Sequence, residues 1–257
     1  MSALIGVGVG PGDPELLTLL GLRILAEADL IVVPVRDDLD EVGYAERVVR
    51  FHLPTATIRR APFALADRSG LSERRVAAWD AAAALIVAGF DAGASRIAFA
   101  TIGDPNVYST FGYLAGSVRE QRPSVDIETV PGITAMQALA VAAGTTLCEG
   151  SEPLVLFPAT GEPADLDTLL RHELLAGATV VAYKGGRHWP AVREVLTARG
   201  RLADAVVGCH LGRDDQTVQS AAAVDGEIPY LSTVIAPPPR AGRGTKLAST
   251  ENGAAKL

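Results

Sequence analysis

The stretch Gly6-Val-Gly-Val-Gly-Pro-Gly-Asp-Pro14 joins an apolar strand to a helix through a glycine-rich turn. Two later stretches have the same character, Gly103-Asp-Pro-Asn-Val-Tyr-Ser-Thr110 and Val130-Pro-Gly-Ile-Thr134. In the first two, Asp-Pro is a helix start in which Asp caps and Pro occupies the first turn. Three such turns can gather at the carboxyl edge of a parallel sheet, where α/β proteins bind ligands. We expect a site for a nucleotide-like cofactor there.

Strands and helices alternate on either side of these turns, which indicates α/β architecture. A break at 150–153 predicts two α/β domains, residues 1–150 and 151–237, with a cofactor cleft between them, followed by a disordered tail over 238–257. The strands are expected at 4–9, 30–33, 96–101, 125–130, 154–157, 179–183, 205–210 and 230–235. The helices are expected at 14–28, 41–52, 72–92, from the Gly103-Asp-Pro turn through Tyr108 and Ser109 to about 120, 134–143, 164–175 and 190–199.

Composition excludes several classes of function. The 257 residues carry a net charge of −7, which argues against a nucleic-acid partner. Cys148 and Cys209 lack metal-ligand spacing, so we expect no metal site, two small apolar fillers and a reduced, cytoplasmic setting. No apolar run is long enough to predict a membrane span, and no signal peptide is expected.

The glycine turns do not fit the standard nucleotide motifs. Counting from Gly6 or Gly8, the third glycine of G-x-G-x-x-G falls on Pro11 or Asp13, which weighs against a nicotinamide-dependent oxidoreductase. No Gly-Lys-Ser/Thr follows, so a Walker loop is excluded as well. Asp13 is expected to cap a helix, while Asp104 has two open interpretations, a cap or a ligand contact.

The three turns in this order resemble the signatures of the tetrapyrrole methylase family. Val-Gly-Pro-Gly-Asp-Pro-Glu-Leu-Leu-Thr at 9–18 is similar to the family's opening, and the resemblance covers residues 4–236. The segments 103–111 and 183–188 most resemble the branch that methylates precorrin-2 at C20. Uroporphyrinogen III methylation and the cobalt-bearing substrate stay open as alternatives, as does a non-catalytic binding module. Methylation of diphthine precursors or of ribosomal RNA also occurs on related folds, and the net charge disfavours the RNA.

The resemblance implies S-adenosylmethionine as cofactor, an anionic tetrapyrrole as substrate and a homodimer. The positive sulfonium of S-adenosylmethionine makes its methyl carbon electrophilic. Catalysis is then mainly the alignment of two bound molecules, and no base is assigned. The resemblance implies that the residues that bind this cofactor are Pro11, Ile102, Gly103, Asp104, Val107, Thr134, Ala135, Lys184, Leu211, Gly212, Val234 and Ile235.

A substrate with eight carboxylates calls for guanidinium groups and hydrogen-bond donors. The candidates that position it are Tyr108, Ser109, Arg36 and Arg187. Arg47, Arg59, Arg60 and His188 are further candidates, each with the competing interpretation of a solvated surface group.

Overall fold

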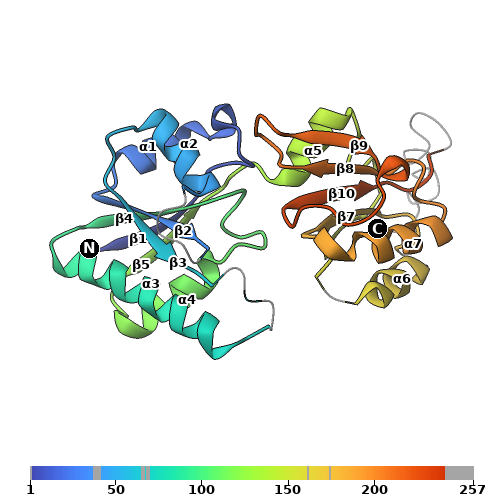
Figure 1. The fold of residues 1–257 in the computed structure, drawn as a ribbon. Coiled ribbons are helices and arrows are strands. Elements are labelled where there is room, and N and C mark those ends of the chain that lie inside the picture. The colour runs from blue at the N-terminus through green and yellow to red at the C-terminus, as the bar shows by residue number, and fades with distance from the viewer. Residues whose placement is uncertain are drawn as a thin grey trace, which may run out of the picture. The chain divides into compact units, whose positions relative to one another are not determined.

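The computed structural model describes residues 2–36, 42–64, 67, 70–160, 162–173 and 175–240. The chain divides into two compact units, Met1–Thr134 and Ala135–Leu257, each with its own five-stranded sheet (Figure 1). This confirms the α/β class predicted from the sequence. Each unit is described by itself below.

Unit 1 is built on a parallel sheet with the order β3-β2-β4-β1-β5. Its strands are β1 (Ala3–Gly8), β2 (Leu30–Val35), β3 (Ile58–Pro62), β4 (Arg96–Thr101) and β5 (Asp126–Val130). Its helices are the 3-10 turn η1 (Pro14–Leu16), α1 (Leu19–Ala26), α2 (Tyr44–His52), α3 (Glu73–Asp91) and α4 (Phe111–Gln121).

Both faces of this sheet are covered by helices. Leu4 and Phe99 point to the face that α3 and α4 cover, in one cluster with Ile86 and Leu114. Ile5 belongs to a second cluster on the other face, against α1 and α2. Because successive side chains of a strand alternate between faces, a parallel sheet buried on both sides needs nearly continuous apolar strands, which β1 and β4 provide.

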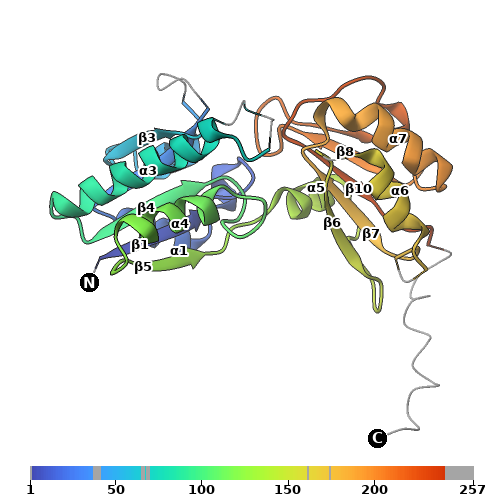
Figure 2. The ribbon, with the colours of Figure 1, turned by 90° about the horizontal axis from the view of Figure 1, so that it is seen from below.

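Unit 2 contains a mixed sheet with the order β6-β7-β10-β8-β9. Its elements are α5 (Ala135–Ala143), β6 (Leu154–Pro158), α6 (Pro163–Arg171), β7 (Thr179–Tyr183), η2 (Gly186–His188), α7 (Trp189–Ala198), β8 (Val206–Cys209), β9 (Thr217–Ser220), η3 (Ala221–Ala223) and β10 (Ser232–Ala236). Strand β10 runs antiparallel to both β7 and β8, and β9 is antiparallel to β8. Helices α6 and α7 cover one face, and α5 covers the other (Figure 2).

The division between the units differs from the expected boundary at residue 150. It falls between Thr134 and Ala135, because α5 packs on the second sheet: Leu139 is fully buried with Val181 and Ile235. The apolar helix was expected to belong with the strands before it. The apolar composition of this helix predicts that it packs on a sheet, but it does not indicate which of the two sheets.

Three further differences concern the ends and edges of elements. The expected helix over 14–28 is interrupted, because the Thr18 side chain accepts a hydrogen bond from the Gly21 N–H and starts α1 anew. Strands β3 and β9 were missed. The expected disordered tail begins too early, since Arg240 donates to the buried carboxylate of Glu152 at 2.7 Å; residues 241–257 lie outside the described part.

Candidate functional site

The three glycine turns meet at the carboxyl edge of the first sheet, as the sequence predicts. They follow β1, β4 and β5, which are neighbours in that sheet. The Gly103 N–H donates to the Gly10 carbonyl at 2.7 Å, so the first two turns are joined directly by backbone. The site in unit 1 is therefore a single assembly of three turns.

Two glycines are required because the backbones of these turns almost touch. A Cβ atom on Gly132 would lie 2.1 Å from the Gly103 carbonyl oxygen, and one on Gly8 would lie 2.5 Å from the same atom. Real Cβ atoms do not approach other atoms so closely, so neither position accepts a side chain without moving a turn. In contrast, a Cβ on Gly103 would meet nothing within 4 Å. The backbone of that turn faces open space, where a ligand can approach it.

The Asp104 carboxylate ties the second turn to the third. Its Oδ1 accepts from the Asn106 N–H at 2.8 Å, and its Oδ2 accepts from the Gly132 N–H at 3.0 Å. Asp104 is not the cap of α4, which begins only at Phe111. Asp13 follows the simpler interpretation, since its Oδ1 accepts from the Glu15 N–H at 2.9 Å and caps η1.

The segment after Asp104 contains both tyrosine and serine candidates. Tyr108 lies in a loop, not on the helix as expected, and its φ of +49° is in the left-handed region that side chains rarely adopt. It is 39% exposed. Ser109 is largely occupied: its Oγ lies 3.0 Å from Thr101 Oγ1 and accepts from the Phe111 N–H at 3.2 Å. Such backbone outliers gather at ligand sites, which favours Tyr108 over Ser109.

The other predicted cofactor residues of unit 1 lie on the same three turns. Ile102 and Val107 are half-buried on the second turn, and Pro11 is buried in the first. Thr134, 7% exposed, ends the third turn. The structure thus brings all the predicted unit 1 cofactor residues to one edge of one sheet.

In unit 2, two residues that directly follow the carboxyl ends of β7 and β8 also have left-handed backbone. Lys184 follows β7 with φ +60°, and His210 follows β8 with φ +52°. The Lys184 N–H donates to the Ser232 carbonyl at 3.1 Å, and the Gly212 N–H donates to Gln216 Oε1 at 2.8 Å. Lys184, Leu211 and Gly212 lie on the turns that follow β7 and β8, and their contact with the cofactor stays a prediction. Leu211 is 5% exposed.

The loop after β8 is fixed by a small ionic cluster. His210 Nδ1 lies 2.8 Å from Asp215 Oδ2, and Arg213 Nε lies 2.7 Å from Asp215 Oδ1. Partial desolvation opposes ionisation of Asp215, but the charges of Arg213 and His210 outweigh it and hold the pKa of that carboxyl below its ordinary value. The cluster braces the turn that carries Leu211 and Gly212.

Val234 and Ile235 do not fit the predicted role. Both lie inside β10, whose two edges are paired with β7 and β8. Their side chains are 1% and 0% exposed and belong to the clusters on opposite faces of the sheet. Backbone and side chains are thus both committed to the fold, and the expected cofactor contact at these two positions is corrected accordingly.

Sequence reasoning missed Tyr183, the last residue of β7. Its hydroxyl accepts a hydrogen bond from the Met136 N–H at 3.3 Å, in the first turn of α5. The first N–H groups of a helix have no partner within the helix, so this bond satisfies one of them. It links the turn that carries Lys184 to the start of the helix that carries Ala135. Nothing in the sequence indicates this pairing.

The arginine candidates divide into two kinds. Arg60 binds the Glu46 carboxylate through two nitrogens, at 2.6 and 3.0 Å, and Arg50 binds it at 2.8 Å. Glu46 is fully buried, and the hydrogen bonds from Arg60, followed by those from Arg50, hold its pKa below the ordinary value. Arg60 is therefore a structural residue. Arg36 is exposed directly after β2, at the same edge as the three turns.

The structure gives less information about the remaining candidates for substrate binding. Arg47 and Arg59 are exposed. His188 ends η2, and Arg187 lies in it, with its side chain outside the described part of the structure. Within the described ranges, no group of three or more His, Cys, Asp or Glu side chains could hold a metal ion, and no helix is long and apolar enough to cross a membrane.

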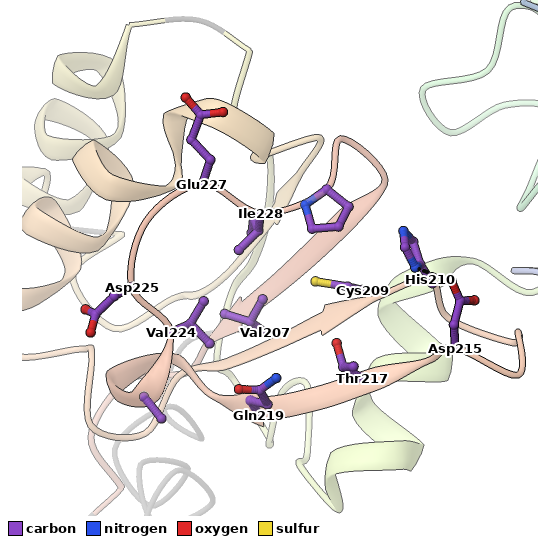
Figure 3. A pocket seen from close by; sticks show the side chains of 12 residues that line it. Val207, Cys209, His210, Asp215, Thr217, Gln219, Val224, Asp225, Glu227 and Ile228 are labelled. Carbon is purple, nitrogen blue, oxygen red and sulfur yellow. Dashed lines mark ion pairs between the residues drawn. The ribbon is translucent and has the colours of Figure 1, made fainter.

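A cavity of about 480 Å³ lies in unit 2, on the α6–α7 side of β8 and β9 (Figure 3). Val207, Cys209 and Ile228 form its apolar part, and Asp225 and Glu227 lie on its outer side. None of the residues that line it is among those predicted to bind the cofactor. Its acidic side makes it unsuited to a polyanionic substrate.

Comparisons with known proteins show the family to which the chain belongs. Residues 3–223 match the family of Tetrapyrrole (Corrin/Porphyrin) Methylases. The chain is 32% identical over 239 residues to a precorrin-2 C(20)-methyltransferase from a Sinorhizobium species, covering 91% of this chain and 94% of that protein. It is 27% identical to the cobalt-precorrin-2 C(20)-methyltransferase of Salmonella typhimurium, with 90% and 94% covered.

Solved structures share the fold. A cobalamin synthesis related protein, CobF, from Corynebacterium diphtheriae superposes with a TM-score of 0.69 at 20% identity, covering 91% of this chain and 98% of that one. Uroporphyrin-III C-methyltransferase from Thermus thermophilus, crystallised with S-adenosyl homocysteine, gives 0.62 at 21% identity, with 91% and 97% covered. With its three interlocked glycine turns and a family match that spans most of its length, this chain belongs to the tetrapyrrole (corrin/porphyrin) methylases.

Proposed function

We propose that this protein transfers a methyl group from S-adenosylmethionine to C20 of precorrin-2, giving precorrin-3A in cobalamin biosynthesis. The observation that carries the proposal is the 32% identity to a precorrin-2 C(20)-methyltransferase over 91% of this chain and 94% of that protein. The cobalt-bearing macrocycle is the second candidate, supported by the Salmonella relative. Uroporphyrinogen III follows, since a relative from Pseudomonas aeruginosa named for that reaction is 33% identical over 200 residues.

The residues present suit S-adenosylmethionine. When bound, the cofactor supplies an electrophilic methyl group on a sulfonium, so the protein needs to provide no nucleophile or metal ion. The open space over Gly103 leaves room for a ligand against the backbone of the second turn. Ile102, Asp104 and Val107 belong to that turn, and Pro11 and Thr134 belong to the two turns that are hydrogen-bonded to it. In unit 2 we assign Ala135, Lys184, Leu211 and Gly212 to the same cofactor.

The work of this chain is then to bind and orient. The Asp104 bridge and the Gly10–Gly103 bond hold three turns in one geometry before a ligand arrives, which reduces the entropy lost on binding. Precise alignment of two bound reactants can lower a barrier by ~7–11 kcal/mol without acid–base chemistry. Tyr108 and Arg36 are our candidates for holding the macrocycle, because both are exposed at the edge that carries the turns. Arg187 stays a candidate as well.

The substrate is tested by offering three acceptors under anaerobic conditions with labelled S-adenosylmethionine: precorrin-2, cobalt-precorrin-2 and uroporphyrinogen III. Mass spectrometry then counts the methyl groups added to each. We expect one methyl on precorrin-2. Turnover of uroporphyrinogen III alone would keep the family and reject the C20 assignment, and turnover of the cobalt compound alone would select the second candidate. We also propose that the protein is cytoplasmic and acts as a homodimer.

A further inference from the structure

Helix α5 has an unusual composition for a helix that lies at the surface. No charged residue occurs in it, and Gln137 is its one polar residue. Its inner stripe, which includes Met136, Leu139 and Ala140, packs on the second sheet. The outer stripe contains Val141, which is 84% exposed, and the exposed Ala142. A helix that is apolar all round is normally covered on both sides.

The neighbouring edge of the sheet has the same character. Strand β9 is in contact with α5 and is the last strand of its sheet; within the described residues nothing pairs with its outer side (Figure 1). The segment from Gln216 to Val224 contains no charge, and Thr217 and Ser220 are exposed. Proteins usually protect such an edge with charged side chains or proline, because it offers free backbone groups for pairing. Here the edge lacks that protection.

The charge of the chain indicates what covers this region. Each copy has a net charge of −7, so two copies repel each other over most of their surfaces. A face without charges brings them together without like-charge contacts. Leu19, 87% exposed at the start of α1, lacks this setting, because Glu15 lies four residues before it and Arg23 four residues after it. A partner of opposite charge would instead be drawn to acidic surface.

We propose that the α5–β9 surface, comprising Ala138, Val141 and Ala142 of α5 with Ser220 and the outer backbone edge of β9, is the face on which two copies of this chain associate. This rests on the homodimer proposed above and specifies where it forms. A twofold dimer uses the same patch on both copies, so a patch that is neutral on one copy is neutral on the other. The uncovered stripe of α5 and the unprotected edge of β9 are then buried together.

The test is sedimentation velocity of the full chain across a range of concentrations, comparing wild type with Val141→Glu. A twofold axis places two new carboxylates in one interface, so we expect the dissociation constant of the dimer to rise at least ~100-fold. Leu19→Glu is the matched control, since it puts the same charge on a similarly exposed apolar position and should leave the dimer intact. Ala142→Glu, on the same stripe as Val141, should behave like Val141→Glu.

Mixing separates an interface from a folding defect. Val141→Glu and Val141→Lys should each be monomeric, with the thermal stability of a folded chain and S-adenosylhomocysteine binding retained, and their mixture should recover the dimer. A wild-type monomer would reject the homodimer itself. If the wild type is a dimer and Val141→Glu leaves it unchanged, only this face is rejected. If Val141→Glu fails to fold and Ala142→Glu still forms the dimer, this face is rejected as well.

Discussion

The Asp104 carboxylate accepts the N–H of Gly132, 28 residues further along the chain, and so fastens the second glycine turn to the third. The same carboxylate accepts the Asn106 N–H. Asp104 is therefore a residue that positions the second and third turns relative to each other. This relationship explains why an aspartate is needed where a helix cap alone would accept serine or threonine equally well.

Replacing Asp104 with Ala should weaken cofactor binding as well as the fold. The half-buried Gly132 N–H loses its acceptor, which costs ~1–3 kcal/mol, while the exposed Asn106 N–H can bond water instead. We expect the free energy of unfolding to fall by about 2 kcal/mol and the Kd for S-adenosylhomocysteine to rise at least ~10-fold, measured by urea unfolding and calorimetric titration. Asp104→Asn retains one acceptor and should be intermediate. Lost stability with unchanged affinity would show that the turns do not hold the cofactor.

Gly132→Ala tests the contact between the turns. Its Cβ would lie 2.1 Å from the Gly103 carbonyl oxygen, so the second and third turns must separate. We expect a loss of ~1–3 kcal/mol and strongly reduced S-adenosylhomocysteine binding. Gly116→Ala on α4 is the control, because a Cβ there meets nothing within 4 Å. That change should stabilise the helix by ~0.5–1 kcal/mol in thermal unfolding. Equal behaviour of the two variants would refute the crowding argument.

Tyr183→Phe removes a hydroxyl and leaves the ring in place. The Met136 N–H loses its acceptor, and the start of α5 is no longer tied to the Lys184 turn. We expect a several-fold increase in the Kd for S-adenosylhomocysteine, corresponding to ~1 kcal/mol, with a smaller change in thermal stability. Tyr113→Phe, an exposed tyrosine on α4, is the control and should leave affinity unchanged. An affinity of Tyr183→Phe equal to wild type would mean that the bond does not order the site.

Acid stability should depend on Glu46. Its folded pKa is below the ordinary value of 4.5, so this carboxylate stabilises the fold above that pH. The stabilisation is lost as pH falls from about 4.5 through the folded pKa, because the protonated group no longer balances Arg60 and Arg50. Glu46→Gln should lose ~1–3 kcal/mol at neutral pH, since the guanidinium groups of Arg60 and Arg50 lose their counter-charge but stay partly exposed to water, and should show a flatter stability profile below pH 4.5. Parallel profiles for both proteins, measured by urea unfolding, would exclude this role.

The sequence predicts the strands that are buried on both faces most accurately. The strands at 96–101 and 179–183 were predicted with the bounds that the structure gives, because continuous apolar runs mark them. Strands β3 and β9 were missed since each lies at the edge of its sheet and carries polar side chains, Arg59 and Arg60 in one and Gln219 in the other. An edge strand is held by one neighbour and needs no apolar pattern.

Some features of the candidate site could be predicted from the sequence, and others could not. The glycine turns could be predicted because crowded or left-handed backbone demands glycine at particular positions. The role of Asp104 stayed open between a cap and a ligand contact, because its partner Gly132 is distant in sequence. The same holds for the bond between Tyr183 and Met136. Val234 and Ile235 were misplaced because position along the chain does not reveal that β10 is the central strand of its sheet.

The central claim concerns where the methyl group goes. Anaerobic incubation of the protein with precorrin-2 and S-adenosylmethionine labelled with carbon-13 in the methyl group, followed by carbon NMR of the product, tests it directly. One labelled methyl attached at the C20 meso carbon is the result we predict. A labelled methyl at any other carbon of the macrocycle, with C20 unsubstituted, would contradict the assignment.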